Sequence, residues 1–152
     1  MNAGRQRTAA AAALVLVTTA AVVLAQGVPL KLVQIVPGDL KFGPIPNGTL
    51  QAAVVGDSTK PGLYAIRTKI PSGLRLQPHF HPDERIVTVL TGTLYVGFGE
   101  RFDPGTMKPL PPGSVFTEPV KQPHFTWAKD GEVLLQIIGN GPTGTTKIPT
   151  GR

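Results

Sequence analysis

The chain of 152 residues contains three histidines, and their spacing is the feature of the sequence that points most directly to chemistry. His79 and His81 form a His-Phe-His triplet, and His124 lies further along the chain. Neutral imidazole binds divalent transition metals through one ring nitrogen, with bonds of about 2.0 to 2.1 Å. Because the chain has no cysteine, thiolate ligands are excluded. A metal site in this protein therefore depends on whether the three histidines converge.

The His-Phe-His triplet is expected on a β-strand, at the end of the segment 74–81. Successive side chains of a strand alternate between its two faces, so His79 and His81 point to one side, about 6.5 Å apart. Two imidazoles at that separation can turn toward one ion. The same pattern also occurs in solvated pairs on a strand surface, so both interpretations stay open on this pattern alone.

The rest of the chain consists of short apolar runs separated by turn signals. Most of its 18 glycines and 16 prolines fall between runs of strand length. β-Branched and aromatic residues fill these runs, and no segment after residue 25 repeats apolar residues at the helical period. The pattern predicts an all-β sandwich or barrel. The expected strands are 50–55, 63–70, 74–81, 85–90, 94–98, 114–118, 125–128 and 133–138.

Residues 1–25 have the pattern of a signal peptide. Arg5 and Arg7 precede an uncharged stretch of alanine, valine and leucine, which ends before a cleavage position at Gln26. A cleaved signal implies a periplasmic or secreted protein that is not attached to the membrane. The alternative is that the segment is retained as an N-terminal membrane anchor. The segments expected after it are an extended lead-in (26–48), a β-barrel (49–140) and an irregular C-terminal arm (141–152).

The formal charge of +6 is spread over single basic residues and forms no basic run. Binding to nucleic acid is not expected, because it requires a clustered basic surface. The sequence also contains no phosphate-binding glycine loop, nucleotide fingerprint or Ser-His-Asp pattern. The expected partner is therefore a small molecule.

Residues 73–92 (GLRLQPHFHPDERIVTVLTG) resemble the first motif of the cupin superfamily, Gly-x5-His-x-His-x3-Glu-x6-Gly. Gly73, His79, His81 and Gly92 fall in register with this motif. The segment GSVFTEPVKQPHFTWA resembles part of the second cupin motif, Gly-x5-Pro-x-Gly-x2-His-x3-Asn. Its matching residues are Gly113, Pro119 and His124, while Lys121 and Ala128 replace the second glycine and the asparagine.

The resemblance implies a small single-domain cupin of the type-2 conserved-barrel kind, which is a jelly-roll β-barrel. In that fold His79 and His81 on one strand meet His124 on another strand inside the barrel mouth. The ion in this family is iron, manganese, zinc, nickel or copper, and the barrels commonly pair into homodimers. Family activities range from dioxygenases and isomerases to sugar binding, so it stays open whether this chain is an enzyme.

One position departs from the first motif. Its glutamate would fall at position 85, where this chain has Arg85. A guanidinium is always protonated and has no lone pair, so it cannot bind a metal. At about 5 Å from a divalent ion it would be repelled by on the order of 6 to 7 kcal/mol at an effective dielectric of about 20. Such an arrangement requires an anion between the two.

Three interpretations of this departure stay open. In the first, a β-bulge shifts the strand by one residue, so that Glu84 becomes a fourth metal ligand and Arg85 leaves the site. In the second, the three histidines hold the metal and Arg85 binds an anionic ligand. In the third, the histidines and Arg85 bind an organic ligand without a metal.

Three further polar residues are relevant to the site. Gln77 shares the strand face of the two histidines, and Gln136 lies within an apolar strand, so both are candidates for contacts with the ligand. The alternatives are a surface amide for Gln77 and an ordinary hydrogen bond in the core for Gln136. Glu118, just before Pro119, is expected to be solvated at a sheet edge.

The sequence thus predicts an exported cupin that binds a divalent metal through three histidines and also binds a small anionic ligand. No reaction follows from it, because Glu84 is the only candidate for a general acid or base. The alternative is a metal-free, non-catalytic periplasmic module that binds or senses a small molecule.

The signal peptide can be tested on protein purified from a secreting host. The mature chain is expected to begin at or near Gln26, because the apolar stretch ends directly before it. Intact mass spectrometry with N-terminal sequencing measures the start. A mature chain that begins at Met1 or Asn2 would contradict cleavage.

Overall fold

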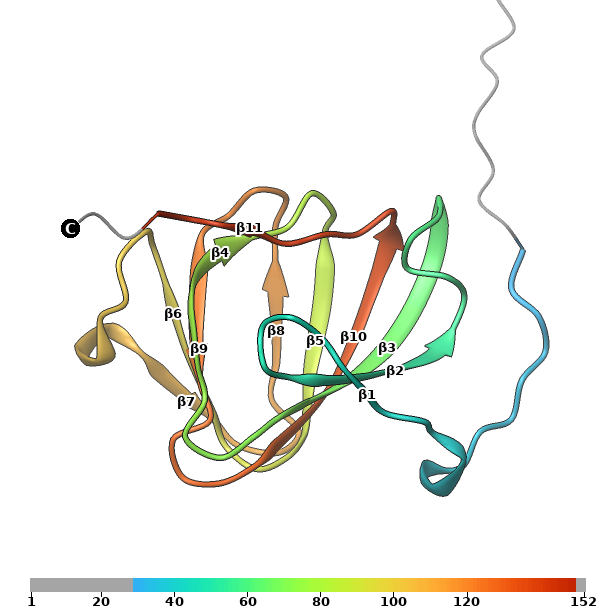
Figure 1. Ribbon diagram of the computed structural model, residues 1–152, viewed down its shortest axis with the longest axis horizontal. Coiled ribbons are helices and arrows are strands. Elements are labelled where there is room, and N and C mark those ends of the chain that lie inside the picture. Colours follow the sequence, from blue (N-terminus) through green and yellow to red (C-terminus); the bar gives the residue numbers. More distant parts are fainter. Residues whose placement is uncertain (1–28, 150–152) are drawn as a thin grey trace, which may run out of the picture.

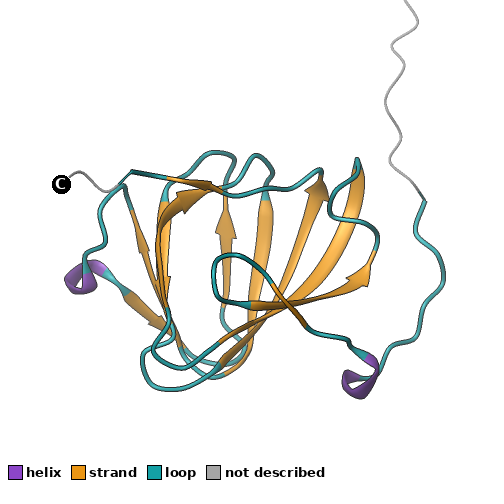
Figure 2. Ribbon diagram, in the orientation of Figure 1, coloured by secondary structure: helices purple, strands orange, loops and turns teal. Residues whose placement is uncertain are grey.

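Two antiparallel β-sheets face each other in residues 29–149, the part of the chain that the computed structural model describes (Figures 1 and 2). The sheets have the strand orders β1-β2-β3-β10-β5-β8 and β11-β4-β9-β6-β7. The expected all-β jelly-roll barrel is confirmed, whereas the predicted signal peptide lies outside the described residues. The strands are β1 (Gly43–Pro44), β2 (Leu50–Val55), β3 (Gly62–Ile70), β4 (Arg75–Phe80), β5 (Arg85–Thr91), β6 (Leu94–Phe98), β7 (Lys108–Leu110), β8 (Val115–Glu118), β9 (His124–Trp127), β10 (Val133–Gly141) and β11 (Thr146–Lys147), with 3-10 turns η1 (Pro37–Asp39) and η2 (Pro104–Thr106).

The core lies between the sheets and follows from the alternation of side chains along the strands. In β3, every second residue from Tyr64 to Ile70 is buried, and β10 repeats this pattern from Val133 to Gly139. Burying one large aliphatic side chain contributes roughly 1.5 to 3 kcal/mol to the stability of the fold. These paired central strands therefore stabilise one side of the core. The cluster comprises Tyr64, Ile66, Ile70, Val87, Val89, Leu94, Val96, Ala128, Val133, Leu135 and Ile137.

The strands β4 and β9 bring two of the histidines together. They are antiparallel neighbours, and His79 is the cross-strand partner of His124. Their register shifts between Leu76 and His79, which is a β-bulge or similar irregularity. The shift breaks the strict alternation of β4, so Gln77 is exposed while Leu76 and His79 both line the cavity described below.

One motif glycine is explained by a turn. Gly92, between β5 and β6, has φ +75°, a conformation that residues with a Cβ rarely adopt. A Cβ at this position would also collide with the carbonyl oxygen of Glu132. The position therefore requires glycine.

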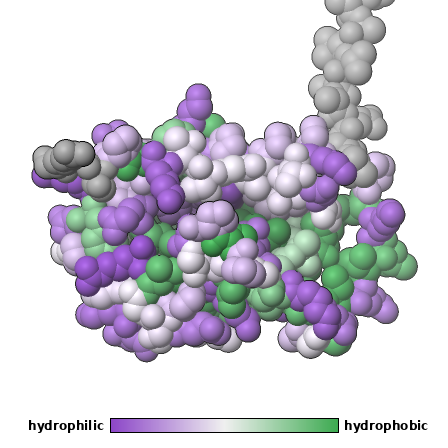
Figure 3. Space-filling view, viewed as in Figure 1, coloured by the Kyte–Doolittle hydropathy of each residue, from purple (hydrophilic) through white to green (hydrophobic). Residues whose placement is uncertain are grey.

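Both segments outside the expected barrel contribute to it. After β10 the chain crosses the rim of the barrel and forms β11, which pairs with His79 and Phe80 of β4 (Figure 1). In the lead-in, β1 pairs with β2, and apolar residues gather on the segment before β1 (Figure 3). None of the helical turns in residues 29–149 is long and apolar enough to cross a membrane.

Gly139 allows a close approach that can be tested. It is the cross-strand partner of Tyr64, and a Cβ there would lie 2.5 Å from Tyr64 Oη and 2.8 Å from Asp83 Oδ2. We expect Gly139→Ala to lower the free energy of unfolding by about 1 to 3 kcal/mol, because buried groups must move. Urea unfolding measures the change. Gly43→Ala, whose Cβ would meet nothing within 4 Å, is the control. An equal effect of both substitutions would contradict this packing.

Candidate metal centre

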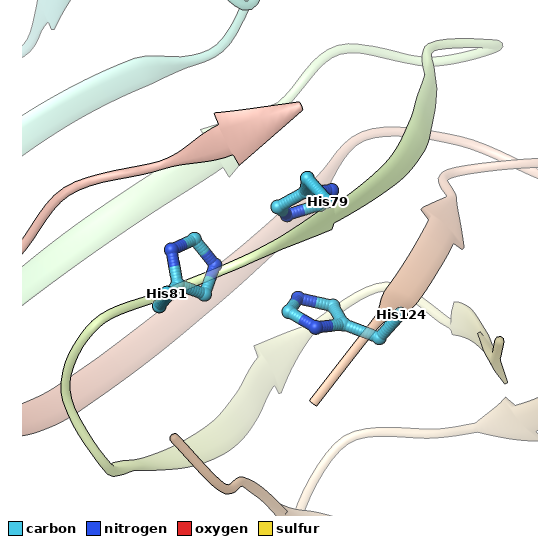
Figure 4. Close-up of side chains that lie close together, drawn as sticks. All are labelled: His79, His81 and His124. Carbon is cyan, nitrogen blue, oxygen red and sulfur yellow. The ribbon is translucent and has the colours of Figure 1, made fainter. Parts of the chain in front are cut away.

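The three histidines converge inside the barrel (Figure 4). One ring nitrogen from each of His79, His81 and His124 lies within 4.8 Å of the other two. The ring centroids are 4.4 to 5.1 Å apart, and all three side chains are buried. Three buried imidazoles at this spacing could hold one metal ion.

Backbone carbonyls fix the orientation of the three rings. His79 Nδ1 lies 2.7 Å from the carbonyl oxygen of Gln77, and His81 Nδ1 lies 2.6 Å from that of Gly144. His124 Nδ1 lies 3.1 Å from the carbonyl oxygen of Gln122. Because a carbonyl can only accept, each Nδ1 carries the proton and donates it, which leaves the Nε2 lone pair free in the neutral ring.

The first two histidines are held in the neutral form. Burial, followed by the proximity of His124, lowers the pKa of His79 to about 4. Burial, followed by the proximity of Arg85, lowers the pKa of His81 to about 4 as well. Near neutral pH a metal therefore has no proton to displace from either ring.

The structure places Arg85, and not Glu84, at the cavity. Arg85 is 8% exposed and lines the cavity, whereas Glu84 is exposed and does not. The ladder of β5 with β8 starts at Arg85 and runs without a shift, so no slip turns Glu84 inward. The expectation of Glu84 as a fourth ligand is therefore wrong.

The two glutamines also lie outside the cavity. Gln77 is exposed because of the irregularity in β4, and its contribution is the carbonyl that orients His79. Gln136 lies on the outer face of β10, where its Oε1 accepts a hydrogen bond from Arg67 Nε at 3.4 Å. Neither side chain lines this cavity, so the structure places both candidates for ligand contacts outside it.

Glu118 is buried, contrary to the expectation of a solvated edge residue. It is 6% exposed and ends β8, beside the histidines. Its Oε1 lies 3.2 Å from His124 Nε2, and its Oε2 lies 3.7 Å from His81 Nε2. Oε2 also lies 3.6 Å from Arg85 Nη1. Glu118 thus stands between the guanidinium and two of the imidazoles.

The ionisation of Glu118 is set by opposing effects. Burial alone would raise the pKa of its carboxyl group, because the charged form is poorly solvated. A hydrogen bond from His124, which requires a proton on its Nε2, and the charge of Arg85 outweigh burial and hold the pKa below its ordinary value. The side chain is therefore a carboxylate near neutral pH.

A second carboxylate, Asp83, holds the other side of the guanidinium. Arg85 Nε lies 3.4 Å from Asp83 Oδ1, and the hydroxyls of Tyr64 and Thr143 each donate to Asp83 at 2.6 Å. Burial and this hydrogen bond raise the pKa of Tyr64 to about 12, so it remains a donor. Arg85 also donates to the Thr143 hydroxyl and the Gly144 carbonyl. The single positive charge of Arg85 thus faces two carboxylates, Asp83 and Glu118. The net negative charge of this group favours the binding of a further cation.

The histidines open onto a cavity of about 220 Å³. At about 30 Å³ per water, this volume corresponds to roughly seven water molecules, which suits a small ligand. Apolar side chains from β3, β6 and β10 line part of it, together with three buried threonines. The Oγ1 atom of one of them, Thr126, has no hydrogen-bond partner within residues 29–149. The cavity is therefore polar at the histidines and lined by a mixture of apolar and polar side chains elsewhere.

Comparison with known proteins shows the fold. No protein-family model and no curated protein matches the chain. A solved RmlC-like cupin from Shewanella frigidimarina is 17% identical, with a TM-score of 0.59 over 74% of this chain and 94% of that one. The polyketide cyclase RemF from Streptomyces resistomycificus is 15% identical, with a TM-score of 0.66 over 80% and 89%. An oxalate oxidase bound to glycolate is 26% identical, with a TM-score of 0.55 over 72% and 60%.

The lowered histidine pKa values predict how pH affects the metal-free protein. Between about pH 4 and 6.5 the unfolded chain binds more protons than the folded one, because its histidines have the ordinary pKa. The free energy of unfolding should therefore fall as the pH is lowered through this range, by up to about 1.4 kcal/mol per pH unit for each of His79 and His81.

Urea unfolding of chelator-treated protein at several pH values measures this slope. In a His79→Gln, His81→Gln variant most of the slope should disappear. A stability that stays constant between pH 6.5 and 4.5 in the unsubstituted protein would contradict the buried, neutral state of the two rings.

Proposed function

Since the chain has the cupin fold, we propose that it binds one divalent transition metal through His79, His81 and His124. One observation carries the proposal: three buried imidazoles converge, and each has its Nδ1 proton engaged by a backbone carbonyl. Imidazole ligands suit iron, nickel, copper and zinc, and manganese is also found in the family that the sequence resembles. When bound, such an ion would act as a Lewis acid toward an oxygen of the ligand.

We further propose that a small polar molecule occupies the cavity. The sequence favoured an anionic ligand at Arg85, but this guanidinium already faces Asp83 and Glu118. An anion would have to displace a carboxylate of the protein from Arg85. A small ligand that hydrogen-bonds the free hydroxyl of Thr126 fits the described cavity better.

The reaction is not assigned by the fold. A polyketide cyclase and an oxalate oxidase both have this barrel, and their likeness to the chain is too low to transfer either activity. The predicted signal peptide supports a periplasmic or secreted protein as part of the proposal. Homodimer formation likewise remains a proposal from the resemblance.

A metal-free binding module is the second candidate. Glu118 Oε1 lies 3.2 Å from His124 Nε2, so a proton shared by these two groups could satisfy them without an ion. This arrangement would keep Arg85 and the cavity in place for a ligand. The two candidates differ in metal content.

Metal analysis of protein purified without a histidine tag separates the two candidates. We expect about one equivalent of a divalent metal in the unsubstituted protein and only background in a His79→Ala, His124→Ala variant. Gln77→Ala is the matched control, because its side chain is exposed and its carbonyl still orients His79. Circular dichroism checks that each variant is folded. Equal, sub-stoichiometric metal in the unsubstituted and double-variant proteins would refute the metal site.

A further inference from the structure

We propose that Glu118 is a fourth protein ligand of the metal, supplied by β8 in place of the glutamate that the first cupin motif has at position 85. The inference rests on the proposed metal function and extends it. It assigns a role to a residue that neither the motif nor the histidine cluster includes.

The spacing of Glu118 from the histidines supports this role. Two ligand atoms that each lie about 2.0 to 2.2 Å from one ion are roughly 3.0 to 3.5 Å apart in octahedral or tetrahedral sites. Glu118 Oε1 lies 3.2 Å from His124 Nε2, which is within this range, and Oε2 lies 3.7 Å from His81 Nε2, slightly beyond it. The carboxylate is therefore at the distance of a neighbouring ligand from His124 and close to it from His81.

The burial of Glu118 supports it independently. The side chain is 6% exposed, and its Oε2 has no hydrogen-bond partner within residues 29–149. Arg85 Nη1 lies 3.6 Å away, which is an ion pair but not a hydrogen bond, so this buried oxygen still lacks a directly bound donor or cation. The histidine nitrogens face the same place, so an ion there would satisfy both.

The sheet explains how position 118 can replace position 85. Arg85 and Glu118 are direct cross-strand partners in the ladder of β5 and β8. Side chains of such partners start about 4.5 to 5.5 Å apart and point to the same face of the sheet. A carboxylate at position 118 on β8 therefore reaches the same space that a glutamate at position 85 on β5 would have reached.

Arg85 then acts as a positioning residue. Its Nη1 lies 3.6 Å from Glu118 Oε2, the same oxygen that lies 3.7 Å from His81 Nε2, so one carboxylate contacts both the guanidinium and a histidine. This places an anion where a guanidinium near a divalent ion requires one. The protein itself supplies that anion, and Asp83 holds the opposite side of the guanidinium.

The test compares two isosteric substitutions of carboxylates. Glu118→Gln removes the proposed ligand charge, whereas Glu84→Gln removes an exposed carboxylate that does not line the cavity. Zn²⁺ affinity is measured by competition with a chromophoric chelator, and the coordination sphere by the visible absorption of Co²⁺-loaded protein. We expect Glu118→Gln to weaken Zn²⁺ binding on the order of 100-fold and to change the Co²⁺ spectrum. Glu84→Gln should change the affinity only a few-fold and keep the spectrum.

Unchanged Zn²⁺ affinity and Co²⁺ spectrum in Glu118→Gln, with metal lost in His79→Ala, His124→Ala, would overturn the role of Glu118 and leave the three-histidine function standing. Absence of binding in the unsubstituted protein would overturn both. If Glu118→Gln does not fold, infrared difference spectra of the unsubstituted protein with and without Zn²⁺ decide. A shift of the carboxylate stretching bands supports ligation, and unchanged carboxylate bands contradict it.

Discussion

A guanidinium buried beside three imidazoles must be neutralised, and much of the site is arranged around that constraint. Arg85 is 8% exposed, so solvent does not screen its charge effectively. Asp83 on one side and Glu118 on the other meet this requirement. Tyr64 and Thr143 in turn hold Asp83 by hydrogen bonds. The single charge of Arg85 is thus neutralised by a network of residues from β3, β5 and β8 and from the segment after β10.

The three histidines are oriented by backbone carbonyls, whereas Arg85 is held mainly by side chains. Their Nδ1 atoms contact carbonyls of Gln77, Gln122 and Gly144, which come from three different segments. The Gly144 carbonyl serves both His81 and Arg85, so the segment that crosses the barrel rim links the two groups. A site assembled from so many fixed dipoles is preorganised, and this favours binding of an ion in one defined position.

Much of the fold and part of the site could be predicted from the sequence. Strand alternation and the cupin spacing were sufficient to place His79 and His81 on one side of a strand facing His124. Alternation could also have revealed Glu118, because it lies two residues after the inward-facing Phe116 in β8. The exposure of Gln77 could not be predicted, since an irregularity within β4 leaves no pattern in the residues. Thr143 and Gly144 lie in a segment without periodicity, so their contacts depend on the folded chain alone.

The central claim is that three histidines and one carboxylate from β8 form a metal site, and that the same carboxylate helps to neutralise Arg85. A crystal structure of the unsubstituted protein grown with Zn²⁺, with an anomalous difference map at the zinc edge, tests it most directly. We expect one strong peak that contacts His79, His81, His124 and Glu118, with Arg85 behind the carboxylate. A map without a peak at the histidines, or a peak there with Glu118 turned away toward Arg85 alone, would contradict the claim.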